Sequence, residues 1–439
     1  MREPQLSVGL IERASVVRGV FHGRFESSGT ILGPGPFECV PGVSGVRCDS
    51  GGVTVEADEL VLTPSDGSPF TLNDIVIGVQ FHWQRAEPQT FRGALRIRRR
   101  DDGSLVPVND VGLEEYLESV ISSEMSAASP IELLRAHAIT SRSWLVAMLE
   151  RGKAPGGPTG WTKSGPGGRE VVRWYTREDH DLFDVCADDH CQRYQGITRV
   201  VSPSVHAAVG DTRGVFLMHG GRICDARFYK ACGGITEEFQ NSWEDVRVAY
   251  LSSISDAATD FPPLASESDV AGWVSSAPGA YCNTRDPDII RQILPSFDQE
   301  THDFFRWSVS YGRDELEEII AGRSGIDVGR LKALVPVKRG PSGRLYSLRI
   351  VGSKETVTVG KELEIRRWLS RSHLYSGAFV VDTAPGPDGE PERFTLRGAG
   401  WGHGVGLCQI GAAVMAVNGH SADQILAHYF RGALLEKRY

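Results

Sequence analysis

The chain has 439 residues, a formal net charge of −9 and 23% charged residues. This length predicts two or three domains. The negative charge argues against a nucleic-acid partner, because only the arginine-rich stretch at residues 96–100 offsets it. The sequence has no run of 18 apolar residues and therefore predicts no transmembrane segment. Its 50 glycines favour loops and β-structure over long helices.

The N-terminal part of the chain predicts β-structure. Residues 6–100 alternate short apolar runs with turn signals. We expect an accessory β-module over residues 1–91 and then a hairpin, FRGALRIRRRDDGSLVPVNDV, that leads into the first helix. Cys39 and Cys48 lie in a glycine- and proline-rich loop and could form a disulfide, although their spacing alone does not establish one.

The stretch from Leu113 to Leu149 predicts two helices joined by a tight turn. Apolar residues recur at steps of three and four in the first helix, and Glu124 continues their stripe. A carboxyl group that loses hydration on a buried face favours its protonated form. Because a general acid must be protonated, Glu124 is the candidate acid. The alternative is a helix-terminal glutamate that turns to solvent.

The second helix carries start signals of its own. Ser129, Pro130 and Glu132 fit the N-cap, N1 and N3 positions of a capping box. Because a helix is predicted on each side of the turn, we expect the turn to hold the Glu124 side chain in a fixed position.

Residues 151–180 are rich in glycine, proline and charge, which predicts an exposed loop. A cysteine and histidine group follows, with Cys186 and Cys191 as thiols and His180 and His190 as imidazole candidates. Two thiolates with one imidazole and a water would make an open zinc site. A disulfide between the two cysteines and two free thiols are the alternatives, and the choice between the histidines is open.

The stretch GVFLMHGGRICDARFYKACGGITEEFQNSWED predicts a hairpin. Its cysteines, Cys224 and Cys232, could bridge neighbouring strands or stay reduced. Residues 257–390 combine helical patterns with strands and turns, and we expect them to form an inserted α+β subdomain.

Two features within residues 257–390 could suggest ligand binding. Phe304, Phe305 and Trp307 are expected in its core rather than on a ligand platform. Arg339 and Arg344 are expected in a solvated turn, with contact to an anionic strand as the alternative.

The last stretch places glycines at 398, 400, 402, 404 and 406. This spacing is not GxGxxG and no βαβ unit follows, which excludes dinucleotide binding. The glycines should let the backbone pass close to a neighbouring group, with His403 held between two of them and Gln409 one helical turn later. Ser421 is expected to cap a final helix whose apolar residues, Ile425, Leu426 and Tyr429, face the core.

Several of these stretches together resemble the SpoIID/LytB family of stage II sporulation protein D and autolysin modifier proteins. The resemblance lies in VNDVGLEEYLESVISSEM with the following helix, in C-x4-C ending in CQ-x-Y-x-G, in Y-x-x-x-GG-x-T, and in GWGHGVG-x-x-Q-x-GA. It covers residues 92–256 and 391–439, which would form the catalytic core around the insertion. The predicted fold class is α+β, with a β-rich core, a helix-turn-helix carrying the catalytic glutamate, an N-terminal β-module and the inserted subdomain.

The resemblance implies work on peptidoglycan. Sporulation members of the family are lytic transglycosylases, and their catalytic glutamate corresponds to Glu124. The cysteine motif is associated with bound zinc, which could be chemical or only structural. Tyr229, Thr236 and Trp243 become candidates for lining a sugar site, with packing in the core as the alternative for the aromatic residues, and His403 and Gln409 would orient the sugar.

The expected reaction cleaves the glycan after N-acetylmuramic acid. No second acid stands in a matching motif, whereas ordinary glycosidases use two. One glutamate suffices if the sugar's 6-hydroxyl attacks and leaves a 1,6-anhydro end. The alternatives are a non-catalytic glycan-binding enhancer of a cell-wall amidase and a zinc-dependent cell-wall hydrolase.

The implied location is the cell envelope, with peptidoglycan strands and other cell-wall enzymes as partners. The sequence begins without a signal peptide, because Glu12 and Arg13 interrupt the apolar segment that one requires. Either a leader has been removed or export is not part of the function, and we expect the first.

Overall fold

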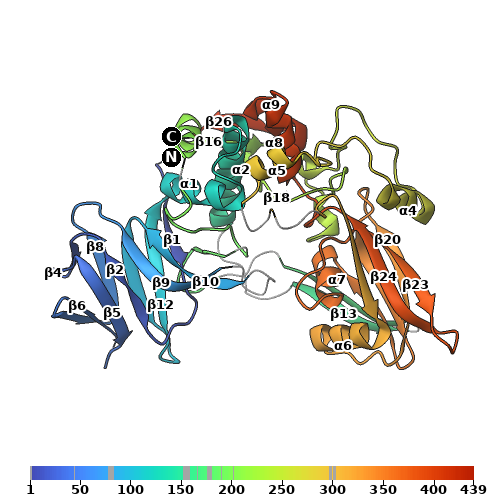
Figure 1. Ribbon diagram of the computed structural model, residues 1–439, viewed down its shortest axis with the longest axis horizontal. Helices are drawn as coiled ribbons and strands as arrows, with labels where there is room; N and C mark the ends of the chain where they lie inside the picture. Colours follow the sequence, from blue (N-terminus) through green and yellow to red (C-terminus); the bar gives the residue numbers. More distant parts are fainter. Residues whose placement is uncertain are drawn as a thin grey trace. The chain divides into compact units, whose positions relative to one another are not determined.

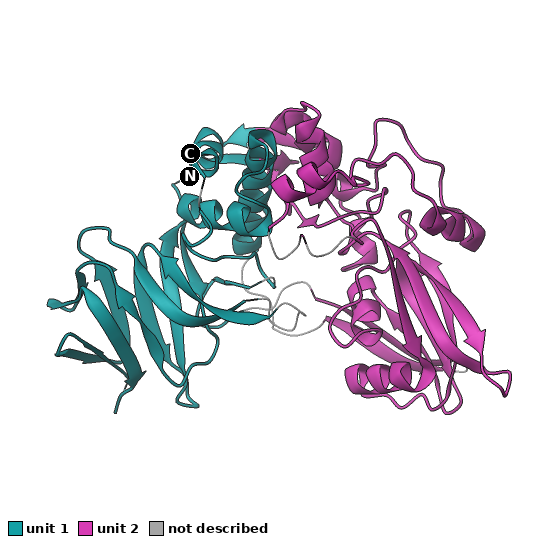
Figure 2. Cartoon of the chain, in the orientation of Figure 1, with its two compact units in different colours: residues 1–152, 179–216, 436–439 teal, residues 153–178, 217–435 magenta. Residues whose placement is uncertain are grey.

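The computed structural model describes residues 2–43, 45–77, 84–151, 159–165, 167–175, 180–188, 190–200, 202–295, 299 and 303–439. The chain forms two compact units (Figure 2). Unit 1 contains Met1–Gly152, Asp179–Phe216 and Glu436–Tyr439, and unit 2 contains Lys153–Glu178 and Leu217–Leu435. Both combine helices and strands (Figure 1), which confirms the α+β class. The domain boundaries predicted at residues 92, 257 and 391 remain predictions.

Two sheets form the β-structure of unit 1 among the described residues. The seven-stranded sheet has the order β15-β1-β12-β11-β8-β3-β4, with β15 Val185–Cys186, β1 Gln5–Gly9, β12 Leu105–Gly112, β11 Ala94–Arg99, β8 Glu59–Pro64, β3 Phe25–Ser27 and β4 Thr30–Leu32. The six-stranded sheet has the order β10-β9-β2-β5-β6-β7, with β10 Arg85–Phe91, β9 Phe70–Ile77, β2 Val17–Phe21, β5 Gly35–Pro41, β6 Val46–Ser50 and β7 Val53–Ala57. The predicted hairpin before the first helix is β11 and β12.

Aromatic side chains fill the space between these sheets. Phe25 of the seven-stranded sheet lies 4.5 Å from Phe21 and 6.1 Å from Phe70 of the six-stranded sheet, measured between ring centroids. All three rings are buried, as expected for inward positions of alternating strands. The first strand, β1, pairs with β12, so the seven-stranded sheet contains strands from both sides of the boundary predicted at residue 92.

Three helices belong to unit 1: α1 Leu113–Glu124, α2 Ile131–Glu150 and α3 Pro203–Asp211. The first two lie where the apolar periodicity predicts them. The predicted capping box is wrong, because Pro130 is the N-cap of α2 and makes no side-chain capping bond. The buried Ser129 hydroxyl makes no hydrogen bond to the described residues.

A buried ion pair joins α1 to α2. The guanidinium of Arg142 donates to both carboxylate oxygens of Glu114, at 3.0 and 2.6 Å. The Tyr439 hydroxyl donates to the same carboxylate at 2.5 Å, and Arg142 also donates to the Val215 carbonyl at 3.1 Å. The side chain of Arg142 is 0% exposed, so these bonds replace its hydration. This network fixes the helix that ends at Glu124.

Unit 2 contains a five-stranded sheet, a three-stranded sheet and a parallel pair of short strands among its described residues. Their orders are β13-β14-β22-β21-β20, β19-β24-β23 and β18-β25, with β13 Thr159–Gly165, β14 Gly168–Trp174, β22 Thr356–Gly360, β21 Leu345–Gly352, β20 Leu331–Arg339, β19 Arg306–Gly312, β24 Pro391–Ala399, β23 Phe379–Pro385, β18 Phe228–Tyr229 and β25 Leu407–Cys408. A further sheet, β17-β16-β26, consists of β17 Arg222–Ile223, β16 Val215–His219 and β26 Leu434–Lys437.

The helices of unit 2 are α4 Glu267–Ser275, α5 Pro287–Ile293, α6 Arg313–Ser324, α7 Glu362–Trp368, α8 Gln409–Val417 and α9 Ala422–Tyr429, with 3-10 turns η1 Phe239–Asn241 and η2 Ala249–Leu251. One hydrophobic core holds residues of α6, α7 and the larger sheets together. Ser421 caps α9 with a capping box, and Ile425, Leu426 and Tyr429 are buried, as predicted.

Parts of unit 2 differ from the sequence-based expectation. The predicted loop at 151–180 contains the hairpin β13–β14, because β14 gains a parallel partner in β22, far along the chain; residues 152–158, 166 and 176–179 of that loop lie outside the described part. Arg344 is 0% exposed and does not lie in a solvated turn. Phe304, Phe305 and Trp307 are buried, as predicted.

Cys39 and Cys48 are directly opposite each other on β5 and β6 rather than in a loop. Both are buried free thiols, so the disulfide is not formed in this structure. Across the described residues, no helix is long and apolar enough to cross a lipid bilayer.

Candidate functional site

Glu124 is the last residue of α1 and its side chain is buried, with 8% of the residue exposed. The backbone N–H of Arg193 donates a hydrogen bond to Oε1 of Glu124 at 3.0 Å. The Arg193 side chain is buried as well, and it donates to the Ser123 carbonyl at 3.3 Å. The carboxylate is therefore held in place from a distant segment of the chain, rather than turned to solvent.

That segment, residues 192–195, packs along both helices. The N–H of Gln195 donates to the Ser119 hydroxyl at 2.9 Å, and the Gln192 amide donates to the Ser141 carbonyl at 3.3 Å. Between them, the ring of Tyr194 stacks on Tyr116 with centroids 5.1 Å apart. Bonds to α1 and to α2 on either side of Arg193 leave its N–H little freedom to move away from Glu124.

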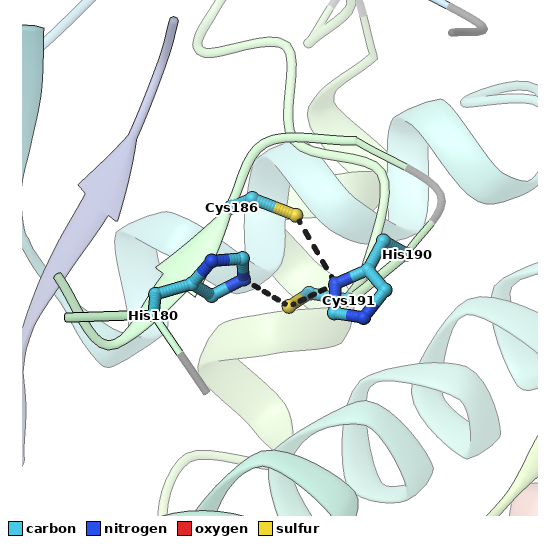
Figure 3. A group of neighbouring side chains, drawn as sticks. All are labelled: His180, Cys186, His190 and Cys191. Atoms are coloured by element: carbon cyan, nitrogen blue, oxygen red, sulfur yellow. Dashed lines mark hydrogen bonds between the residues drawn. The ribbon is translucent and has the colours of Figure 1, made fainter. Parts of the chain in front are cut away.

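The predicted cysteine and histidine group assembles immediately before this segment (Figure 3). Cys191 Sγ lies 3.4 Å from His180 Nε2 and 3.4 Å from His190 Nδ1, and Cys186 Sγ lies 3.6 Å from the same His190 nitrogen. One ligand atom from each of the four residues lies within 4.8 Å of all the others. The structure thus brings both candidate histidines to the thiols, rather than one.

The donor chemistry of this group fits zinc. A hydrogen bond with Cys191 lowers the pKa of the Cys186 thiol, and hydrogen bonds with His180 and His190 lower it further against the effect of burial. A thiolate is the form that binds a metal. Two cysteines with two histidines make a complete tetrahedral set, which is typical of a structural zinc site rather than an open catalytic one.

The hydroxyl of Tyr116 interacts electrostatically with both the Glu124 carboxylate and the two thiols of this group. Burial raises the pKa of its hydroxyl well above the ordinary value, and the Cys191 and Cys186 thiols and the Glu124 carboxylate raise it further. Its hydroxyl oxygen is buried without a hydrogen-bond partner among the described residues. The same phenol therefore lies in the electrostatic field of both groups.

In unit 2, the glycine-rich loop adopts conformations that only glycine accepts readily. Gly402 and Gly406 have φ values of +102° and +85°. A Cβ on Gly402 would lie 2.8 Å from Tyr229 Cβ, and one on Gly406 would lie 2.2 Å from the Arg227 carbonyl. The predicted close approach is confirmed, and the partner is the protein's own backbone and side chains.

His403 is fixed within this loop by the backbone. Its Nδ1 accepts from the Val405 N–H at 3.1 Å and its Nε2 lies 3.1 Å from the Phe228 carbonyl. These partners specify the neutral tautomer protonated at Nε2. Burial lowers the pKa of His403 well below 6.5, and the positive charge of Arg227 lowers it further.

Two of the other predicted sugar-site residues surround His403. Its ring centroid lies 5.2 Å from that of Tyr229 and 4.9 Å from that of Trp243. Trp243 is braced from outside this group, because its Nε1 donates to the Tyr175 carbonyl at 3.1 Å and the Arg227 guanidinium lies 4.2 Å from the ring centroid.

Thr236 and Gln409 are placed differently. The hydroxyl of Thr236 accepts from the Ile254 N–H at 2.8 Å, so backbone pairing uses it. Gln409 is the first residue of α8, is 1% exposed, and directly follows Cys408, the strand partner of Tyr229.

The predicted site residues fall into two groups. Glu124 and the cysteine and histidine set belong to unit 1. Tyr229, Thr236, Trp243, His403 and Gln409 belong to unit 2.

Comparison with known proteins shows similarity to sporulation proteins. Residues 101–219, which contain α1, α2 and the zinc-fitting set, match the family described as Stage II sporulation protein (SpoIID). The chain is 25% identical over 335 residues to stage II sporulation protein D of Bacillus amyloliquefaciens, covering 74% of each chain. It is 23% identical over 332 residues to the protein of that name in Bacillus subtilis (strain 168), covering 75% of this chain and 76% of the relative.

The chain is therefore similar to proteins of the SpoIID/LytB family.

A further relative carries a different name. The amidase enhancer of Bacillus subtilis (strain 168) is 23% identical over 336 residues, which cover 73% of this chain and 40% of the enhancer. Residues 237–406 match a domain of unknown function (DUF8618). That match contains α4 to α7 and most of the glycine-rich loop.

Two residues around Glu124 were missed by the sequence reasoning. Arg193 is the unspecified position of the CQ-x-Y motif, between Cys191 and Tyr194. Its place two residues after a candidate metal ligand is the signal that could have identified it. Tyr116 falls on the apolar stripe of α1 by its spacing, and only the fold brings its hydroxyl near the two thiols and Glu124.

Proposed function

We propose that this protein is a lytic transglycosylase that cleaves peptidoglycan glycan strands with Glu124 as its general acid and base. The single observation that supports the proposal most is the placement of Glu124, a buried carboxylate held at 3.0 Å by the Arg193 N–H. A general acid needs such a fixed, weakly hydrated position. The stage II sporulation protein D relatives support a cell-wall role.

In this mechanism Glu124 transfers its proton to the glycosidic oxygen between N-acetylmuramic acid and N-acetylglucosamine as the bond to the anomeric carbon breaks. The carboxylate then accepts the proton of the muramyl 6-hydroxyl, whose oxygen forms the new bond to the anomeric carbon. The products are a 1,6-anhydromuramyl end and a free 4-hydroxyl. No outside water is consumed, so one carboxyl group is enough.

The cysteine and histidine set has a positioning role in this proposal. His180, Cys186, His190 and Cys191 would hold a zinc ion, which would supply a fixed cross-link rather than an acid or a nucleophile. Cys191 is followed directly by residues 192–195, which bond to α1 and α2 and carry the Arg193 N–H. Holding Cys191 therefore holds the hydrogen bond to Glu124.

We further propose that Tyr229, Trp243 and His403 form a glycan-binding group. Flat aromatic rings suit the apolar faces of pyranose rings, and the group is rigid because its polar atoms bond mostly to the backbone. Tyr229 and Trp243 are only 5% and 7% exposed in this structure, so a sugar could stack on them only after their rings are uncovered. His403 would support the two larger rings, because both of its nitrogens are already engaged. Thr236 and Gln409 would contribute by fixing the backbone beside the group.

The second candidate function is a non-catalytic enhancer of a cell-wall amidase, which the amidase enhancer relative favours. A third, a zinc-dependent hydrolase, would need an open position on the metal, and a set of four protein donors disfavours one. All three candidates place the protein in the cell envelope with peptidoglycan as a partner.

One digestion experiment separates these functions. Intact peptidoglycan and peptidoglycan stripped of stem peptides are incubated with the wild type, with Glu124→Gln and with protein treated with a chelator. Mass spectrometry of the soluble products then identifies anhydro ends, reducing ends or released peptides. Anhydro ends that vanish in Glu124→Gln support the transglycosylase.

The other outcomes contradict that choice. Reducing ends or released peptides that depend on metal and survive Glu124→Gln indicate a zinc hydrolase. No products from either substrate, combined with faster digestion when a cell-wall amidase is added, indicate an enhancer.

A further inference from the structure

A second group of potential metal ligands lies within unit 2. It consists of Cys232, Asp256, Cys282 and Cys408, and all four residues are buried, with at most 2% of each exposed. Cys232 Sγ lies 3.3 Å from Cys282 Sγ and 3.2 Å from Asp256 Oδ2. One ligand atom from each residue lies within 4.8 Å of all the others.

The spacing of these atoms fits one small ion. Zinc binds sulfur at about 2.3 Å and carboxylate oxygen at about 2.0–2.2 Å, so the ligands of a tetrahedral site stand about 3.5–3.8 Å apart. The distances from Cys232 Sγ, 3.2 Å to Asp256 Oδ2 and 3.3 Å to Cys282 Sγ, and the upper limit of 4.8 Å for the whole group bracket this value. Three thiolates with one carboxylate are soft enough to select zinc over magnesium or calcium.

The ligand atoms are also oriented by a surrounding layer of hydrogen bonds. The Tyr429 hydroxyl donates to Asp256 Oδ1 at 2.5 Å, and the Cys282 N–H donates to Oδ2 at 3.0 Å. The Cys232 N–H donates to Cys408 Sγ at 3.2 Å, and the Gly234 N–H donates to Cys232 Sγ at 3.3 Å. Such bonds to ligating carboxylates and sulfurs are the outer shell that built metal sites share.

Positively charged side chains near the group would balance the net negative charge of a metal site with these four ligands. Three thiolates and a carboxylate around a divalent ion leave a net negative charge, and two guanidinium groups stand beside the cysteines. Arg344 donates to the Cys232 carbonyl at 3.2 Å, and Arg306 donates to the Gly233 carbonyl at 2.9 Å. Cys408 is the N-cap of α8, where the helix dipole favours a thiolate.

We propose that Cys232, Asp256, Cys282 and Cys408 bind a second zinc ion. This site is separate from the cysteine and histidine set of unit 1 and does not depend on the activity proposed for Glu124. It would join four segments of unit 2 that are distant in sequence, because Cys282 lies between α4 and α5 while Cys408 ends the glycine-rich loop. The ion would thereby fix the backbone shortly after Tyr229, at Cys232, and shortly after His403, at Cys408.

Metal content of the whole chain tests this proposal. The protein is expressed with zinc, purified under a reducing agent without chelator, and analysed by elemental mass spectrometry. We expect two zinc ions per chain in the wild type. Cys282→Ser and Cys408→Ser should each reduce the content to one, and Cys186→Ser with Cys191→Ser should also leave one. Cys224→Ser, which removes a buried thiol outside both groups, should keep two.

Cobalt spectroscopy tests the second site without substituting any of its ligands, so it remains informative if the Cys282 and Cys408 variants are unstable. The Cys186→Ser, Cys191→Ser protein is reloaded with cobalt, which should show sulfur-to-cobalt charge transfer and the intense visible bands of a tetrahedral thiolate site. One zinc per wild-type chain, lost entirely with Cys186 and Cys191, would overturn the proposal. So would recovery of Cys232 and Cys282 as a disulfide-linked peptide, and iron in place of zinc would overturn the choice of metal.

Discussion

The backbone N–H of Arg193 and the carboxylate of Glu124 are joined by a 3.0 Å hydrogen bond between segments 69 positions apart in sequence. Glu124→Gln keeps an oxygen that can accept this bond but removes the proposed proton-transfer group. We expect glycan cleavage to fall by about 10²–10⁴-fold, the usual contribution of a general acid or base. Release of anhydromuramyl products from purified peptidoglycan measures the loss.

Glu118→Gln is the matched control for this variant, because Glu118 lies on the same helix and pairs with His206 instead. It should retain activity, and both variants should melt within a few degrees of the wild type. A fully active Glu124→Gln protein would show that the carboxylate has no part in the chemistry.

The buried pair of Arg142 and Glu114 should carry much of the stability of the two helices. Arg142→Met leaves the Glu114 carboxylate buried without its cation, which costs about 3–5 kcal/mol. Arg135→Met, on the same helix, removes a partly exposed ion pair with Asp211 and should cost only about 0–1 kcal/mol. Chemical denaturation of the three proteins gives the differences, and equal costs for both variants would refute the assignment.

Gly406→Ala should damage unit 2 more than its backbone conformation alone explains. The new Cβ would meet the Arg227 carbonyl at 2.2 Å, in addition to the strain of φ +85°. Gly419→Ala has a similar φ of +89° with no atom within 4 Å, so it isolates the conformational cost of about 1–2 kcal/mol. We expect a clearly larger drop in melting temperature for Gly406→Ala; equal drops would contradict the close packing described.

Acid should destabilise unit 2 through its buried histidines. Burial and neighbouring arginines hold the pKa of folded His403 below the ordinary 6.5. Below about pH 6.5, His403 therefore binds a proton in the unfolded chain but stays neutral in the folded chain. Stability is thus fully present above this pH and is lost as pH falls toward the folded pKa, by up to about 1.4 kcal/mol per pH unit for each such group.

A variant isolates the part that His403 plays in this effect. Burial also lowers the pKa of His373 to about 3 and that of His428 to about 4, so the wild-type slope contains all three groups. His403→Gln should have a shallower fall in melting temperature between pH 7 and pH 5. A slope equal to that of the wild type would show that His403 titrates normally in the folded protein.

Local pattern predicted much of the region around Glu124. The three- and four-residue spacing of apolar side chains placed α1 and α2 and put Glu124 on their buried side, because helical periodicity is a local property. The sequence also predicted the grouping of four potential metal ligands, because all of them lie within a short stretch of chain: His180, Cys186, His190 and Cys191. Ser129 shows the limit of local pattern. Serine is a common N-cap residue, but the backbone starts α2 one residue later, with Pro130 as the N-cap.

Long-range pairing explains what could not be predicted. Residues 159–165 and 168–174 look like parts of a loop by composition, and they form β13 and β14, which pair with each other while β14 also pairs with the distant β22. Arg344 looks solvated beside a proline and two glycines, yet the fold buries it against the Gly402 and Cys232 carbonyls. The ligands of the second metal group are 24 to 176 positions apart, without the short spacings that identify a zinc motif.

The seven-stranded sheet ends at β15, a strand of two residues that contains Cys186 and covers the outer side of β1. The Asp184 carboxylate helps to hold β15 on β1, because it accepts from the Ser7 N–H at 2.9 Å and from the Ser7 hydroxyl at 2.8 Å, and a zinc ion bound to Cys186, as proposed above, would strengthen this pairing. Removal of that proposed ion would weaken the pairing and make the polar backbone of β1 more available to another molecule. Metal-depleted preparations should therefore self-associate into aggregates before they lose their helices.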